Sequence, residues 1–324
     1  MASTAMTPNK LFDVLIIGGG PAGLSIATSL ARQAHTALVL DSGAYRNAAA
    51  RHMHNVPGFD HVDPAEFRAK VREDLRARYA SVEFRSATVR QVRRLEGVFE
   101  AVDEEGTVYR GRKLGLATGV RDKLEEEVPG YAECWGRGVF HCLFCHGFEE
   151  RGVESAGLLA GGMPATPEIM AHVARMAKRL SKRVTIYTNT KHGDLLPAVK
   201  ALLHSSRITI DTRPIKSLAL VGHGPQVQIT FADGSTATEG FIASHPGVEQ
   251  RGGDLAAQLG LEMTPMGDVK VSPPFNETSV AGCFAAGDAA VAMKSVVSAL
   301  HTGTFAGTGV IAQLQRELDE ADEL

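Results

Sequence analysis

Short apolar runs alternate with amphipathic stretches along the chain, and this order predicts an α/β fold. Residues 12–17 and 37–40 are rich in aliphatic and β-branched side chains, so we expect two strands there. An amphipathic stretch from residue 21 to about 34 lies between them and predicts a helix. A strand, a helix and a strand in this order form a βαβ unit.

The same order returns in the second half of the chain. Residues 157–160 and 184–187 predict strands, and Thr166-Pro167-Glu168 predicts the start of a helix between them. The chain therefore contains two Rossmann-like units, the second an internal repeat of the first. The other predicted elements are a helix that opens at Asp63-Pro64-Ala65-Glu66 and runs to about Tyr79, and short strands between 82 and 117 with a turn at Glu105-Gly106. Further strands are predicted at 208–210, 218–221, 227–231 and 280–288, the last ending in Gly-Asp, with a hairpin turn at 232–235 and a closing helix over about 295–318.

A glycine-rich turn follows the first predicted strand directly, with the pattern G-x-G-x-x-G at Gly18, Gly20 and Gly23. Such a turn lets the backbone approach a pyrophosphate, and the N-terminus of the next helix receives the phosphates. Asp41 ends the following strand, where a carboxylate accepts hydrogen bonds from ribose hydroxyls. Together these features predict an adenine dinucleotide site; a glycine turn without a ligand is the alternative.

The corresponding turn of the second unit is altered. Ala160 stands where the first glycine is expected, and Pro164 removes a backbone N–H. The next strand ends in Thr188-Asn189-Thr190-Lys191-His192, with no carboxylate for a ribose and no arginine cluster for a 2′-phosphate. We therefore expect the nicotinamide site of this unit to be lost, although Lys191 could still hold a phosphate.

Composition and charge exclude several classes of protein. The chain has 324 residues, long enough for two domains, and its formal charge of −3 gives no basic surface for nucleic acid. No apolar run reaches the roughly 18 residues of a membrane helix, and residues 1–10 lack the apolar core of a signal peptide. We expect a cytoplasmic protein, in which four cysteines do not make a disulfide scaffold.

Cys142 and Cys145 form a C-x-x-C pair at the expected start of a helical turn. Two thiols at this spacing can close a small disulfide ring and so store two electrons. A helix N-terminus and the flanking His141 and His146 would favour the thiolate, which is the form that attacks a disulfide. In a chain with βαβ patterning and no secretory features, the pair predicts redox chemistry.

Two other interpretations of the pair are weaker. A zinc half-site needs two more ligands, but the remaining thiols, Cys134 and Cys283, are single and lie outside any second C-x-x-C. The pair could also be two small buried hydrophobic residues, although the flanking histidines and Gly147 argue against this. The sequence therefore predicts no metal site.

The chain resembles the low-molecular-weight thioredoxin reductases over nearly its whole length. The matching residues are the first glycine turn with Asp41, Ala117-Thr118-Gly119, the C-x-x-C pair, and Phe284-Ala285-Ala286-Gly287-Asp288, in the same order. The resemblance implies two Rossmann-like dinucleotide-binding domains, the second inserted in the first. Residues 1–120 and 247–324 would form a discontinuous FAD-binding domain. Residues 121–246 would form an NAD(P)-like domain that carries the C-x-x-C.

A narrower group matches better. Residues 41–47, Met53-His54-Asn55 and Cys142 to Glu149 resemble the fungal FAD-dependent dithiol oxidases of epidithiodiketopiperazine biosynthesis, the gliotoxin oxidase group. The reductases usually carry Asp directly after the second cysteine, where this chain has His146. The altered second glycine turn agrees with enzymes that dispense with NADPH and pass electrons to O2.

The resemblance also implies roles for individual residues. The FAD pyrophosphate would lie on the first glycine turn, its adenosine ribose at the end of the second strand, and its ribityl chain near the Gly-Asp sequence; the backbone before the last helix would face the flavin pyrimidine edge. These cofactor-binding residues are Gly18, Gly20, Pro21, Ala22, Gly23, Asp41, Ser42, Arg46, His54, Asn55, Ala117, Thr118, Gly119, Asp288, Lys294, Ser295 and Val296.

The expected activity is FAD-dependent oxidation of a small-molecule dithiol to an intramolecular disulfide, with O2 as acceptor and H2O2 as product. Cys142 and Cys145 would exchange with the substrate, and His146 would act as base or only orient the turn. His141 and His301 are reserve bases. The alternatives are an NADPH-dependent disulfide reductase of the thioredoxin reductase type and a flavin-binding scaffold or sensor without turnover. A homodimer is implied by the resemblance alone.

Overall fold

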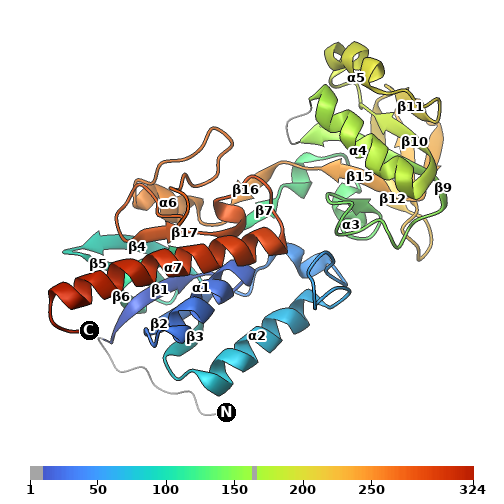
Figure 1. The fold of residues 1–324 in the computed structure, drawn as a ribbon. Coiled ribbons are helices and arrows are strands. Elements are labelled where there is room, and N and C mark those ends of the chain that lie inside the picture. The colour runs from blue at the N-terminus through green and yellow to red at the C-terminus, as the bar shows by residue number, and fades with distance from the viewer. Residues whose placement is uncertain (1–9, 163–165) are drawn as a thin grey trace. The chain divides into compact units, whose positions relative to one another are not determined.

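The computed structural model describes residues 10–162 and 166–324. The chain divides into two compact units, whose elements are labelled in Figure 1. The first unit comprises the residues up to Arg51, Val62–Arg121 and Glu249–Leu324. The second comprises Asp122–Val248 together with the short segment His52–His61. The sequence analysis placed residues 52–61 in the first domain, whereas the structure groups them with the second unit.

The first unit is built on a mainly parallel sheet. Its strand order is β3-β2-β1-β6-β5-β4, and β17 pairs with the end of β6. The pairs β3–β2, β2–β1, β1–β6 and β6–β17 are parallel, whereas the pairs β6–β5 and β5–β4 are antiparallel. The bounds are β1 Leu11–Ile17, β2 Ala37–Asp41, β3 Val82–Ser86, β4 Val89–Leu95, β5 Val98–Asp103, β6 Val108–Leu116 and β17 Cys283–Ala285.

The apolar runs of β1 and β2 are continuous because the sheet is covered on both faces. Val14 and Ile16 of β1 belong to the core that α1 (Pro21–Arg32) and α7 (Val296–Glu320) share, while Leu15 and Ile17 point into the core on the opposite face. The second core also contains side chains of α6 (Gly253–Gln258). Burial on both sides fixes the register of β1 and thus the position of the turn that follows it.

Helices α1 and α7 approach each other closely, and small residues make this possible. A Cβ at Gly303 of α7 would lie 2.4 Å from the carbonyl oxygen of Ala22, and one at Gly307 would lie 2.7 Å from the Cβ of Ser29. The helix rich in small residues that the sequence predicts is therefore the partner of α1. Helix α2 (Pro64–Arg78) begins where predicted, because Asp63 accepts a hydrogen bond of 2.6 Å from the N–H of Ala65.

The second unit repeats the pattern with a five-stranded parallel sheet in the order β11-β10-β9-β15-β8. Helix α4 (Pro167–Leu180) packs on it and starts at the predicted Thr166, whose hydroxyl caps the N–H of Ile169 at 3.3 Å. An antiparallel sheet, β12-β13-β14, completes the unit. The bounds are β8 Val139–Phe140, β9 Val153–Gly162, β10 Ser181–Tyr187, β11 Ile208–Asp211, β12 Ile215–Leu220, β13 Val227–Phe231, β14 Thr236–Glu239 and β15 Ile242–His245, with α3 Tyr131–Cys134 and α5 Leu196–Leu202.

The chain passes between the units through β7 (Val120–Asp122) and β16 (Val248–Gln250), which pair with each other. The predicted strands and long helices are thus confirmed, and the fold is α/β with Rossmann-type parallel sheets. The short elements α3, α5, α6, β7, β8, β15 and β16 were not predicted. Within the described residues, no helix combines the length and apolarity needed to cross a membrane.

Candidate active site

The turn between β1 and α1 has the shape that a bound pyrophosphate requires. Gly18 has φ +113°, and a Cβ at Gly23 would lie 1.9 Å from the carbonyl oxygen of Gly18, so larger residues do not fit at either position. At Gly20, in contrast, a Cβ would meet no described atom within 4 Å. The backbone at Gly20 therefore faces open space at the start of α1, where the helix dipole favours an anion.

Asp41 lies at the carboxyl end of β2, beside this turn. Its carboxylate accepts hydrogen bonds from the N–H groups of Gly19 at 3.3 Å and Gly43 at 3.1 Å, and from the side chains of Tyr45 and Arg72. Burial raises the pKa of Asp41, but the hydrogen bonds from Tyr45, Gly43 and Arg72 outweigh it and hold the pKa below its ordinary value. Asp41 is thus an ionised, positioned acceptor at the place that the sequence predicts.

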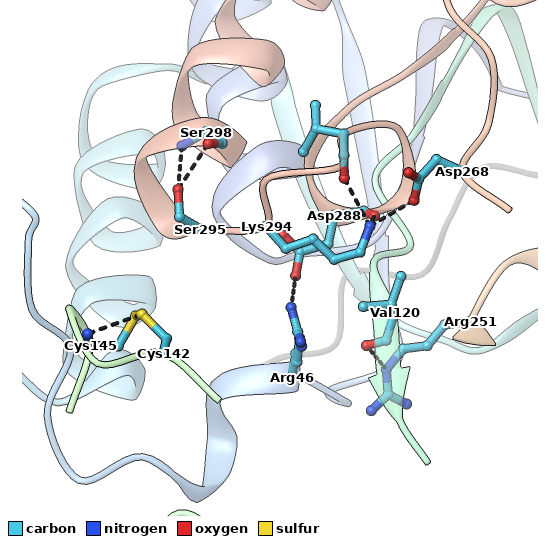
Figure 2. A network of polar contacts seen from close by, with 11 residues as sticks. Arg46, Val120, Cys142, Cys145, Arg251, Asp268, Asp288, Lys294, Ser295 and Ser298 are labelled. Carbon is cyan, nitrogen blue, oxygen red and sulfur yellow. Dashed lines mark hydrogen bonds and ion pairs between the residues drawn. A yellow bond between two sulfur atoms is a disulfide. The ribbon is translucent and has the colours of Figure 1, made fainter. Parts of the chain in front are cut away.

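A second polar network precedes α7 (Figure 2). Arg46 Nη1 lies 3.2 Å from Asp288 Oδ2, and both side chains are largely buried. The Lys294 ammonium donates to Asp268 Oδ1 at 2.7 Å and to the carbonyl oxygens of Asp288 at 2.9 Å and Val291 at 2.8 Å. These bonds fix the loop that joins η4 (Gly287–Ala289) to α7.

The start of α7 is capped by a side chain. Ser295 accepts a hydrogen bond of 3.1 Å from the N–H of Ser298, so the backbone of Lys294, Ser295 and Val296 is held at the helix N-terminus (Figure 2). That this backbone meets a flavin stays a prediction. The Lys294 side chain itself is engaged with Asp268, which the sequence did not single out.

The remaining predicted cofactor residues lie in two places. Ala117, Thr118 and Gly119 follow β6 in the first unit, where a Cβ at Gly18 would lie 2.2 Å from the Ala117 carbonyl oxygen. His54 and Asn55 lie instead in the short segment that belongs to the second unit. The structure therefore brings together Gly18 to Gly23, Asp41, Arg46, 117–119, Asp288 and 294–296 within one unit, but not His54 and Asn55.

Cys142 and Cys145 form a disulfide in the second unit, with their Cα atoms 5.2 Å apart (Figure 2). Both residues are half-buried, and the N–H of Cys145 donates to Cys142 Sγ at 3.0 Å. An N–H in this position would stabilise negative charge on the Cys142 sulfur in the reduced pair. The predicted redox pair is therefore paired in the structure.

The pair lies in a helical turn, as predicted, but this turn does not continue into a helix, so the helix N-terminus expected there is absent. Hydrogen bonds from the N–H groups of Cys145 and His146 to the Cys142 carbonyl oxygen, at 3.2 and 3.0 Å, close a single turn only. Gly147 has φ +111° and ends the helical path directly afterwards. The local amide of Cys145, and not a helix dipole, is therefore what the structure provides to a thiolate.

Aromatic side chains surround the redox turn. The His146 ring stacks on Phe140 with centroids 5.0 Å apart, and burial lowers the pKa of His146 below its ordinary value. His146 is therefore a neutral proton acceptor near neutral pH. Phe144 and Phe148 are 67% and 61% exposed, which is unusual for phenylalanine and leaves an apolar surface beside the disulfide.

The nucleotide edge of the second unit differs from that of the first. After β10, Thr188 is buried, and the Asn189 side chain accepts a hydrogen bond of 2.7 Å from the N–H of Ile215. These residues stand where a ribose-binding carboxylate is found in the first unit. Of the predicted altered turn, Ala160 lies in β9, whereas Pro164 lies outside the described residues.

The family model for pyridine nucleotide-disulphide oxidoreductases matches residues 12–303 of this chain. The chain belongs to this family. Its members are FAD-binding flavoproteins, so this protein is a flavin-dependent disulfide oxidoreductase with FAD as its cofactor. The predicted family and cofactor are confirmed.

Similar proteins are named thioredoxin reductases, which agrees with membership of this family. Thioredoxin reductase aclD of Aspergillus oryzae is 44% identical over 310 residues, which cover 94% of this chain and 96% of that protein. Thioredoxin reductase tcpT of Claviceps purpurea is 44% identical over 326 residues, which cover 97% and 98%. Both are fungal proteins, as the resemblance drawn from the sequence implies.

Solved structures show the same fold. An oxidoreductase from Agrobacterium tumefaciens matches with a TM-score of 0.82 and 30% identity, covering 94% of this chain and 99% of that one. The structure of HlmI matches with a TM-score of 0.86 and 26% identity, covering 98% and 97%.

The residues of this oxidoreductase fit FAD. The open backbone at Gly20 suits a pyrophosphate, and the ionised Asp41 suits a ribose diol, whose hydroxyls would share the carboxylate with Tyr45 and Arg72. The sequence did not single out Arg72 or Tyr45. Tyr45 lies four residues after Asp41, but an arginine on an amphipathic helix such as α2 carries no signal of its own.

Proposed function

We propose that this oxidoreductase is a dithiol oxidase, which closes an intramolecular disulfide in a small secondary-metabolite dithiol of the epidithiodiketopiperazine type. The observation that carries the proposal is the half-buried Cys142–Cys145 disulfide beside two exposed phenylalanine rings. A small apolar dithiol can lie on such rings and reach the sulfur atoms. FAD, when bound, would accept the two electrons of the reduced pair and pass them to O2, which yields H2O2.

The exchange with substrate takes two steps that balance. A substrate thiolate attacks Cys142 Sγ, which breaks the Cys142–Cys145 bond and forms a mixed disulfide. The second substrate thiolate then attacks the substrate sulfur and releases Cys142 as a thiolate, next to the Cys145 N–H at 3.0 Å. The substrate loses two electrons and two protons, and the cysteine pair gains the electrons.

His146 is proposed to remove a proton from the substrate thiol. Burial lowers the pKa of His146, so its ring is unprotonated near neutral pH and can accept a proton. Its stacking on Phe140 holds the ring beside the turn that carries both cysteines. If His146 only orients the turn, replacing His146 should lower kcat less than the loss of a general base would.

The main competing function is that of an NADPH-dependent disulfide reductase, which the names of the relatives favour. Against it stand the chain at Thr188 to His192, which has no arginine cluster for the 2′-phosphate of NADPH, and the engagement of Asn189 with Ile215. The Lys191 side chain is exposed and could still meet a phosphate. We favour the oxidase because the segment after β10 offers Lys191 alone, and no arginine, to the 2′-phosphate of NADPH.

Oxygen consumption separates the two functions. Purified holoprotein is mixed with a small dithiol in air, with and without NADPH, and O2 uptake and H2O2 are measured. The oxidase predicts dithiol-dependent uptake that NADPH does not change. Rapid loss of the visible flavin absorption with NADPH alone, together with no dithiol-dependent uptake, would favour the reductase.

By resemblance to thioredoxin reductases we also propose a homodimer, which sedimentation of the holoprotein tests.

A further inference from the structure

Imidazole and carboxylate groups converge in the second unit in a cluster that takes no part in the sulfur exchange. His54 and His61 come from the segment His52–His61, and Glu149 follows the redox turn. One potential ligand atom from each of these three side chains lies within 4.8 Å of the others. This cluster contains no thiol, so it differs from the zinc half-site weighed for the C-x-x-C pair.

The loop that carries the two histidines is held in shape by its own hydrogen bonds. The N–H of His61 donates to the Met53 carbonyl oxygen at 2.9 Å, and the N–H of Asn55 donates to Asp60 Oδ1 at 2.8 Å. The side chain of Met53 is buried, which anchors the loop. The His54 and His61 rings are thereby held with their centroids 5.1 Å apart before any ligand binds.

The separation of the polar atoms suits a tetrahedral cation. His54 Nε2 lies 3.5 Å from Glu149 Oε1. Two ligands at about 2.0–2.1 Å from a tetrahedral zinc ion lie roughly 3.4 Å apart, so an ion fits between these atoms with little movement.

The groups behind the ligands have the arrangement that metal sites use. The other ring nitrogen of His54, Nδ1, lies 3.4 Å from Asp60 Oδ2, and such a carboxylate orients a ligating histidine. His52 stacks on His61 with centroids 3.9 Å apart and an interplanar angle of 20°. Both ligating rings therefore have a neighbour that fixes their direction.

We propose that His54, His61 and Glu149 bind one zinc ion, with water in the fourth position. Two imidazoles and a carboxylate form a donor set that zinc accepts and that hard cations such as Mg²⁺ do not prefer. The ion would join the loop 52–61 to the segment directly after the redox turn. None of the three ligands exchanges with the sulfur atoms of Cys142 and Cys145, so zinc binding can be measured without the proposed oxidase activity.

Zinc binding to the metal-free holoprotein tests the site. The measurements use equilibrium dialysis against Zn²⁺ and the visible absorption of added Co²⁺, which reports tetrahedral coordination. The parent for all variants is the Cys142→Ser, Cys145→Ser double variant, so that thiols of the redox pair cannot bind the metal. We expect one zinc ion per chain in this parent, and the Co²⁺ spectrum should lack thiolate charge-transfer absorption.

His61→Ala and Glu149→Gln are the informative substitutions, because neither residue is assigned to FAD, as His54 is. Each should lower zinc affinity by at least about tenfold. His223→Ala, which removes an exposed histidine between β12 and β13, is the matched control and should leave affinity unchanged. Flavin absorption and metal-free thermal unfolding identify a variant that fails to fold.

Thermal unfolding gives a second measurement on the same variants. Zinc should raise the unfolding temperature of the parent and of His223→Ala, but not that of His61→Ala or Glu149→Gln. The proposal is overturned if the parent binds no zinc. It is also overturned if both ligand variants bind zinc as tightly as the parent does.

Discussion

Among single residues, Cys142 and Cys145 provide the sulfur atoms that the proposed thiol exchange requires. They form a disulfide in a turn, whereas the other two cysteines, Cys134 and Cys283, are single and buried. Burial raises the pKa of Cys283 to about 12 and also raises that of Cys134, so both stay protonated and inert. Only the C-x-x-C pair is therefore equipped for thiol exchange.

Replacing either member of the pair should abolish dithiol oxidation. In Cys142→Ser and Cys145→Ser, H2O2 production from a small dithiol is expected to fall to the rate without enzyme, while FAD stays bound. Cys134→Ala is the control and should retain turnover, with some loss of stability because its side chain is buried. Unchanged peroxide production in both serine variants would instead indicate a flavin-binding protein whose pair is not catalytic.

Substitution of His146 separates a base from an orienting group. We expect His146→Asn to lower kcat by roughly 100-fold, the lower end of the range for a general base. Loss of orientation alone should affect the closing of the disulfide, so the rate at which the reduced pair reoxidises is the second measurement. A variant that keeps wild-type kcat at saturating dithiol would remove His146 from the mechanism.

At the level of secondary structure, we propose that the strand, turn and helix formed by β1 and α1 bind the FAD pyrophosphate. Their sequence was enough to predict them, because every feature is local: a buried strand, glycines at fixed spacing, and an acid at the end of the next strand. Gly20 and Gly23, which both belong to this turn, have different physical roles, however. A Cβ at Gly23 would clash with the backbone of Gly18, whereas a Cβ at Gly20 would point into open space.

This difference predicts two distinct phenotypes. Gly23→Ala should destabilise the protein by about 1–3 kcal/mol or more, because the backbone must move. Gly20→Ala should leave the unfolding of the FAD-free protein unchanged but weaken FAD binding by at least about tenfold, because losing a hydrogen bond to a charged phosphate costs about 1.5–3 kcal/mol. FAD titration and thermal unfolding of the FAD-free variants measure both effects. Wild-type FAD affinity in Gly20→Ala would show that the pyrophosphate lies elsewhere.

The junction of β1 with the segment before β2 gives a dependence of stability on pH. Contact with His35 lowers the pKa of Asp13 from its ordinary 3.8 to about 2, against the effect of burial, and the Thr36 N–H and hydroxyl contribute through hydrogen bonds of 2.8 and 2.9 Å. Because the folded-state pKa is depressed, this stabilisation is complete above about pH 4 and is lost as pH falls towards about 2.

Asp13→Asn should therefore lower the free energy of unfolding at neutral pH by about 2 kcal/mol, since each pKa unit corresponds to about 1.4 kcal/mol. The difference from the wild type should shrink as the pH falls from about 4 to about 2. Denaturant unfolding at several pH values measures it. A difference that stays constant over this range would mean that the carboxylate charge is not the cause.

At the scale of the whole molecule, the two Rossmann-type units have kept different features. The first retains its glycine turn and Asp41, and the second has Asn189 bonded to Ile215 at the equivalent edge. The sequence predicted the repeated fold and the redox pair because these depend on neighbouring residues. It could not predict that Arg72 meets Asp41 or that Glu149 meets His54, because such contacts join segments far apart in the chain and carry no local pattern.

We propose that electrons enter this oxidoreductase from a dithiol through the Cys142–Cys145 pair and leave to O2, without NADPH. Anaerobic titration of the FAD-loaded protein with a small dithiol, followed by admission of air, tests it most directly. We predict that the dithiol removes the visible flavin absorption under anaerobic conditions and that air restores it, with H2O2 formed in proportion. A flavin that stays oxidised in excess dithiol but is reduced at once by NADPH would show that this oxidoreductase is a reductase and not a dithiol oxidase.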